Sequence, residues 1–156
     1  MSIVRYTFTE AQLRSRLLAR LGGGRTLIAW RSGADQLLVD LRTLTVALGE
    51  GWLAVEFPVT VAGGAAAPFQ LVFWLGLEGE GEGVSATCTV GKEPAGMSER
   101  WTPQLRRLCW EAVLDLLESA VLQAEKSAPG SALTLLGYQA GGGAGSGTVT
   151  VDVSIG

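Results

Sequence analysis

Carboxylates, thiols and clustered glycines are the residues of this 156-residue chain whose types could do chemistry. Glu78, Glu80 and Glu82 alternate with glycines, and carboxylate oxygens are the ligands that hard cations prefer. Their spacing lacks the oxygen-rich pattern of a calcium-binding loop, so a solvated hairpin tip is the favoured interpretation. We therefore expect no metal and no cofactor.

Catalytic motifs are missing from the chain. It contains no histidine, which removes the usual general base and the zinc sites that need imidazole. Gly143 and Gly145 are followed by Thr148, where a dinucleotide-binding loop needs its third glycine, and neither glycine cluster is followed by Lys-Ser or Lys-Thr. No Ser-x-x-Lys or Gly-x-Ser-x-Gly pattern occurs. These observations favour a protein that is not an enzyme.

Composition narrows the remaining classes of function. Apolar residues make up 47% of the chain and charged residues 17%, which leaves room for a ligand cavity or a subunit contact. The net charge is −3 and the basic residues are scattered, which argues against nucleic-acid binding. Cys88 and Cys109 lie far apart in sequence, on the apolar faces of an expected strand and an expected helix. We expect buried free thiols, with a disulfide left open for an exported protein.

The length is typical of a single domain, which we assign to residues 1–156. The N-terminal MSIVRYTF lacks the apolar stretch of a signal peptide, and no run approaches the roughly 20 apolar residues of a membrane span. We therefore expect a cytoplasmic protein without a membrane span. A periplasmic location remains the alternative if the chain is a trimmed mature form.

A short helix is predicted near the N-terminus. Thr9 followed by Gln12 forms a capping box, and Phe8 with Leu13 forms a hydrophobic staple. One apolar stripe follows, and the glycines 22–24 end the helix. The stripe is Leu13, Leu17, Leu18 and Leu21.

Alternation with a period of two predicts strands between residues 26 and 90. The apolar phase changes near Arg42 and Thr43, which indicates a bulge or a break, and Pro58 suggests an edge or bulge position. Residues 69–75 are apolar on both faces, so we expect a cover on the second face. Further strands are expected at 84–90, 133–138 and 148–155.

A long helix is predicted from Thr102, with Pro103 in its first turn and apolar residues at helical spacing as far as Ala124. Because the strands cluster instead of alternating with helices, the predicted class is α+β. We expect a curved antiparallel sheet wrapped around this long helix of the C-terminal half, together with the short N-terminal helix.

The order of these elements, with the TFTEAQL helix start at 7–13 and the Val-x-Val-x-Val strand at 149–153, resembles the TULIP (tubular lipid-binding) superfamily, and most closely its small bacterial envelope members. This resemblance implies a non-enzymatic protein that binds a lipid or another apolar ligand in a generic groove. No individual functional residue is carried over by it. A cystatin-like or other helix-on-sheet fold remains the competing interpretation.

Two binding hypotheses follow. In the first, an apolar ligand such as a fatty acyl chain lies between the long helix and the sheet, with Leu17 and Leu21 on a lid. The predicted lining is Leu53, Val55, Phe57, Phe73, Leu108, Val113 and Leu117. In the second, the protein is a structural or interaction module, and in one version a homodimer. Its partner surface is the opposite sheet face with Trp52, Val72 and Trp74.

Overall fold

The computed structural model describes residues 1–75, 87–97, 99–142 and 146–156. Within these ranges the chain folds into two helices and nine strands. The acidic stretch with Glu78, Glu80 and Glu82, the start of the strand expected at Val84, and the glycines Gly143 and Gly145 lie outside the described residues.

The helices are α1 (Glu10–Gly22) and α2 (Thr102–Ser127). In chain order, the strands are β1 (Ser2–Thr9), β2 (Leu27–Ser32), β3 (Asp35–Asp40), β4 (Thr45–Gly49), β5 (Trp52–Val61), β6 (Ala67–Trp74), β7 (Thr87–Lys92), β8 (Leu133–Gly141) and β9 (Thr148–Ile155). The break expected near residues 42–43 is confirmed, because β3 ends and β4 begins on either side of it.

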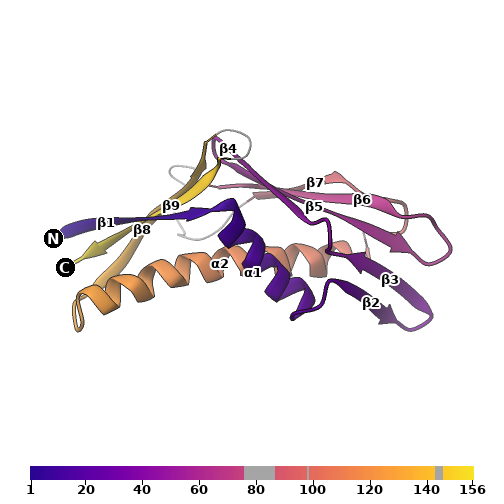
Figure 1. The fold of residues 1–156 in the computed structure, drawn as a ribbon, viewed down its shortest axis with the longest axis horizontal. Coiled ribbons are helices and arrows are strands. Elements are labelled where there is room, and N and C mark those ends of the chain that lie inside the picture. The colour runs from indigo at the N-terminus through magenta and orange to yellow at the C-terminus, as the bar shows by residue number, and fades with distance from the viewer. Residues whose placement is uncertain (76–86, 98, 143–145) are drawn as a thin grey trace.

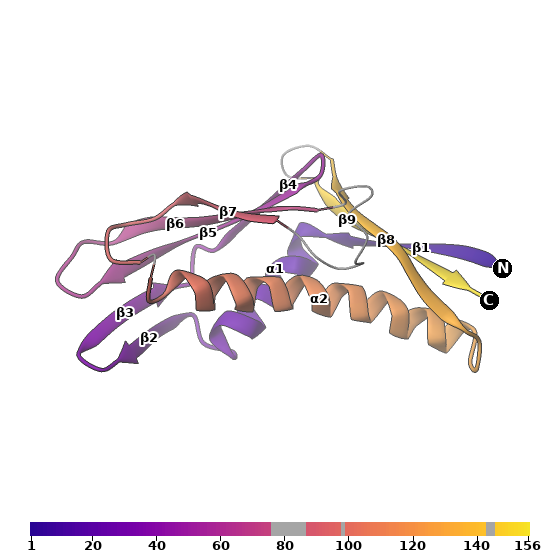
Figure 2. The same cartoon turned by 180° about the vertical axis from the view of Figure 1, so that it is seen from behind.

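The strands form two antiparallel sheets. The larger sheet has the order β2-β3-β5-β6-β7, with β4 also paired to β5, and the smaller sheet has the order β1-β9-β8. Figures 1 and 2 show the larger sheet beside the N-terminal half of α2 and the smaller sheet beside its C-terminal half, with α1 crossing near the middle. The α+β class and the long helix are confirmed. The strands that accompany this helix are divided between two sheets.

α1 begins at the predicted capping box. The Gln12 backbone N–H donates to Thr9 Oγ1 at 3.2 Å, and the Thr9 N–H donates to Gln12 Oε1 at 2.8 Å. The helix ends at Gly22, and Gly23 adopts the left-handed conformation with φ 57°, which glycine reaches without a steric penalty. Its buried face lies between α2 and β4 and consists of Leu13, Leu17 and Leu21.

α2 begins at Thr102, and Pro103 occupies its first turn, where a missing N–H costs no hydrogen bond. The hydroxyl of Thr102 donates to Glu93 Oε2 at 3.0 Å. Because α2 packs against α1 and both sheets, its buried side is wide. That side consists of Leu105, Cys109, Ala112, Val113, Leu116, Leu117, Ala120 and Ala124.

Pro58 lies in an inner strand, where a proline is unusual. β3 pairs with residues 59–61 of β5 and β4 pairs with residues 52–56, so Pro58 falls in the gap between these two partners. On the other side of β5 it faces Pro68 of β6. Pro58 therefore has no partner among the described strands on one side, as the expected edge position requires, although β5 as a whole is an inner strand.

The turn between β4 and β5 connects the two sheets. Gly51 has φ 77°, a backbone conformation that favours glycine. Its N–H donates to the Ala140 carbonyl of β8 at 2.8 Å, and its carbonyl accepts from the Leu75 N–H, next to β6, at 2.7 Å. One residue thus joins the end of β8 to the end of β6.

Candidate functional site

The residues predicted to line a ligand groove lie in the hydrophobic core. Six of them are at most 3% exposed, and the seventh, Leu108, is partly buried against the same cluster. The Phe73 ring stacks on Trp110 of α2 at a centroid distance of 6.0 Å. A ligand at this place would have to displace such packed side chains. The six are Leu53, Val55, Phe57, Phe73, Val113 and Leu117.

The predicted lid residues, Leu17 and Leu21, belong to this same core cluster. α1, which carries them, is bonded to β4 and to the turn before it. The Arg14 guanidinium donates to the Leu44 carbonyl at 3.0 Å, and the Leu48 N–H donates to Glu10 Oε1 at 3.4 Å. Movement of α1 would therefore break polar contacts and expose two buried leucines.

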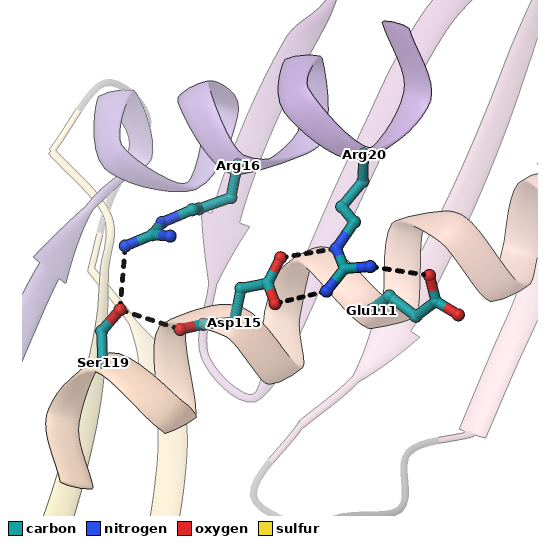
Figure 3. A network of polar contacts seen from close by, with 5 residues as sticks. All are labelled: Arg16, Arg20, Glu111, Asp115 and Ser119. Carbon is teal, nitrogen blue, oxygen red and sulfur yellow. Dashed lines mark hydrogen bonds and ion pairs between the residues drawn. The ribbon is translucent and has the colours of Figure 1, made fainter. Parts of the chain in front are cut away.

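A polar network joins α1 to α2 along the surface (Figure 3). The Arg20 guanidinium donates to both carboxylate oxygens of Asp115 at 2.7 Å and to Glu111 Oε2 at 3.3 Å. One helical turn earlier, Arg16 Nη2 donates to Ser119 Oγ at 2.8 Å, and that hydroxyl donates to the Asp115 carbonyl at 2.9 Å. The bidentate pair fixes the orientation of α1 on α2.

Hydrogen bonds from Arg20 hold the pKa of Asp115 below its usual range. A lowered pKa in the folded state means that the ion pair adds stability above the unfolded-state pKa of about 3.9 and loses it as the pH falls through the folded-state pKa. Asp115→Asn should therefore lower the urea midpoint at about pH 7, and the difference from the wild type should shrink as the pH falls through the lowered folded-state pKa of Asp115.

Glu125→Gln is the matched control for this pH experiment, because Glu125 is exposed on the same helix. Its urea midpoint should follow that of the wild type at each pH. A midpoint difference for Asp115→Asn that persists unchanged in acid would attribute the effect to packing instead of charge.

The predicted partner residues meet on the outer face of the larger sheet. Trp52 lies directly opposite Trp74, and Val72 lies opposite Ala54 in the next pair on the same face. Trp74 is 40% exposed, while Trp52 and Val72 are partly buried. A cover was expected over this face of β6, but Trp74 is open to solvent. We call Trp52, Ala54, Val72 and Trp74 the tryptophan patch.

Gly49 of β4 makes room for one of these indoles. It pairs with Trp52 across the β4–β5 hairpin, and a Cβ at this glycine would lie 2.2 Å from Trp52 Cε2. The ring therefore rests against the β4 backbone. The role of Gly49 was not predicted from the sequence. The Gly-Glu-Gly-Trp turn at 49–52 does indicate it, because a two-residue turn places its flanking residues, Gly49 and Trp52, opposite each other.

Beside the tryptophan patch, the outer face becomes polar. Glu56 accepts from Lys92 Nζ at 2.7 Å and from Gln70 Nε2 at 3.2 Å, so the two charges offset each other. Next to Glu56, a shallow hollow of about 360 Å³ lies over the paired residues Pro58 and Pro68. Its lining is Thr43, Thr45, Glu56, Phe57, Pro58, Ala66, Ala67 and Pro68.

Both cysteines are free. Cys88 lies opposite Phe73 on the inner side of β7 and is partly buried, and Cys109 is buried in α2. Burial raises the pKa of each thiol, so both stay protonated near neutral pH and are poor nucleophiles.

The chain was compared with protein-family models, curated proteins and solved structures. No family model, curated protein or solved structure matches it. Within the described part of the chain, no group of three or more cysteine or acidic residues could hold a metal ion. None of the described helices combines the length and hydropathy needed to cross a membrane.

Proposed function

We propose that the protein is a non-enzymatic self-association module, in which two copies pack through the outer faces of their larger sheets. The observation that carries this proposal is the Trp52–Trp74 pair on the outer sheet face next to Val72, in which Trp74 is exposed and Trp52 is partly buried. Tryptophan supplies much of the binding energy of protein interfaces, because it buries a large apolar area with little loss of side-chain entropy.

The size of the face suits a weak association between two copies. The strands β4 to β7 contain 29 residues, and each residue covers about 16 Å² at a rise of about 3.3 Å and a strand spacing of about 4.8 Å. The resulting area of about 460 Å² per copy lies below the roughly 800 Å² of a standard interface, in the range of transient ones.

The charges of the face also suit a second copy. A two-fold interface brings the same patch of both copies together, so unbalanced charge would repel itself. Here the Glu56 carboxylate is paired with the Lys92 ammonium group within one copy. Two such faces can approach each other without placing like charges in contact.

Sedimentation velocity over a range of protein concentrations tests the proposal. The mass should rise from the 16.3 kDa of one chain towards twice this value as the concentration increases. A species that keeps the mass of one chain at the highest soluble concentration would contradict self-association.

A second candidate function is the binding of a lipid or another apolar ligand between α2 and the larger sheet, as the TULIP resemblance implies. One observation is compatible with it: the predicted lining and the predicted lid residues Leu17 and Leu21 belong to a single apolar cluster beneath α1, and a ligand would bind by displacing side chains packed there. Native mass spectrometry of the purified protein should then show a co-purified apolar molecule. The mass of the bare chain, together with no displacement of a fluorescent fatty acid, would contradict this function.

A further inference from the structure

β1 is an edge strand without the usual protection against strand addition. It pairs with β9 over all eight of its residues without a bulge, and its sequence SIVRYTFT has no proline or lysine. Its one charged side chain, Arg5, is bound by Asp152 of β9 at 2.8 Å. Ile3 is 59% exposed. Natural sheets usually blunt such an edge with charges, prolines or bulges.

The other edge strands of the two sheets are protected in these ways. β8 has a register shift between Leu135 and Gly137, and its Ala140 carbonyl is occupied by the Gly51 N–H. The pairing of β7 with β6 is also irregular, and β7 ends at Lys92. β2 has only six residues, and the short strand β4 lies against α1, where its Leu48 N–H donates to Glu10 Oε1. β1 differs from these strands in being long, regular and, within the described ranges, uncovered along its free edge.

A groove of about 440 Å³ begins where β1 ends and runs between α1 and α2. Figure 1 shows β1 and α1 on the same side of α2, and Figure 2 shows β8 on the opposite side. Along α2, the exposed Leu122 lies one turn beyond the groove residue Ser119. The described lining is Phe8, Gln12, Ser15, Arg16, Ala19, Leu116, Ser119 and Gln123.

Arg16 is the one charged side chain among the described residues that line this groove. Its Nη2 donates to Ser119 Oγ at 2.8 Å, which holds the guanidinium across the groove (Figure 3). A guanidinium in this position favours a carboxylate, which it can bind through two parallel hydrogen bonds. The carboxylate of Asp115 also interacts with Arg16, but both of its oxygens accept hydrogen bonds from Arg20. The lining of the groove therefore holds a guanidinium that can bind a further carboxylate, on a chain whose net charge is −3.

We propose that β1 and this groove bind an extended acidic peptide from another protein. The peptide adds as a strand along the free edge of β1, and one of its carboxylate side chains binds Arg16. Main-chain hydrogen bonds to the edge supply affinity, while the groove selects the side chains. The charge argues for a foreign segment over a second β1, because the β1 sequence contains arginine and no acidic residue. This site is separate from the tryptophan patch.

Selection of phage-displayed random linear peptides on the full chain tests the proposal. The enriched peptides should alternate apolar and polar residues and contain Asp or Glu. Their affinity, measured by fluorescence anisotropy, should fall about tenfold or more in Arg16→Gln, because a charge-assisted bidentate contact is lost. Arg25→Gln removes the same charge at an exposed position away from the groove and should leave the affinity unchanged.

A second pair of variants tests the edge itself. Ile3 and Thr134 both pair with Ser154 and occupy the two ends of one row across the smaller sheet. Ile3→Glu places a repelling charge on the β1 edge and should weaken peptide binding. Thr134→Glu places the same charge on the β8 edge and should not. Urea midpoints of both variants close to that of the wild type would show that both folds are intact.

Hydrogen exchange locates the bound peptide. The amides of β1 should exchange more slowly when an enriched peptide is added. Failure to enrich any peptide, enrichment of peptides that bind Arg16→Gln as well as the wild type, or protection on β5 and β6 instead of β1 would each overturn the proposal. Concentration-dependent protection of β1 without peptide, abolished by Ile3→Glu, would assign the edge to a second copy and would also overturn it.

Discussion

Replacing Leu17 by alanine is expected to lower the free energy of unfolding by about 2–5 kcal/mol. Leu17 has no exposed surface and lies in the centre of the α1 face that packs on α2 and β4. Removing its side chain loses the transfer free energy of the buried carbons and leaves a cavity that the surrounding residues fill only in part. Urea unfolding followed by circular dichroism measures the change.

Leu27→Ala is the control for this loss, because Leu27 is a leucine at an exposed position. Its effect should stay within about 0.5 kcal/mol. The same pair of variants examines the lid interpretation of α1. If α1 is a lid, Leu17→Ala should release an apolar ligand without a loss of stability. An unchanged urea midpoint together with loss of the ligand would therefore contradict the assignment of Leu17 to the core.

Replacing Trp74 by serine is expected to weaken self-association by about 30-fold or more. Tryptophans at the centre of interfaces commonly contribute 2 kcal/mol or more to binding, and this free energy corresponds to about a 30-fold change in the dissociation constant. Stability should change little, because Trp74 is already 40% exposed in one copy. Sedimentation velocity gives the dissociation constants, and urea unfolding checks the fold.

Leu136→Ser is the matched control for the tryptophan substitution. Leu136 is an apolar residue of similar exposure, 49%, but it lies on the smaller sheet. If both variants weaken self-association equally, the effect comes from general surface hydrophobicity and the tryptophan patch is not the interface. A dimer that persists in Trp74→Ser would also contradict the proposed function.

The local elements of this fold could be predicted from the sequence because their signals are local. The Thr9–Gln12 capping box marks the start of α1, and the change of apolar phase near Arg42 marks the break between β3 and β4. The division into two sheets could not be predicted. Arg5 and Asp152, which face each other in the smaller sheet, are 147 residues apart, and periodicity carries no information about such pairing.

The sequence predicted the tryptophan patch better than it predicted a ligand groove. Strand alternation places Trp52 and Trp74 on the face opposite the core, and the structure brings them together as direct neighbours. Groove residues such as Val55 and Val113 could not be distinguished from core residues, because both kinds are apolar and occupy inward positions. The groove at Arg16 was not found, since it depends on how α1 lies against α2.

The pairing of β1 with β9 has a consequence for the biosynthesis of the protein. β1 is translated before the other strands of this fold but finds its strand partner only when β9 has left the ribosome, because the two strands pair from Ser2–Ile155 to Thr9–Thr148. The consecutive strands β2 to β6 can pair earlier, with short loops to close. During synthesis both edges of β1 are unpaired, so the nascent chain carries an aggregation-prone segment for longer than any other strand of this fold.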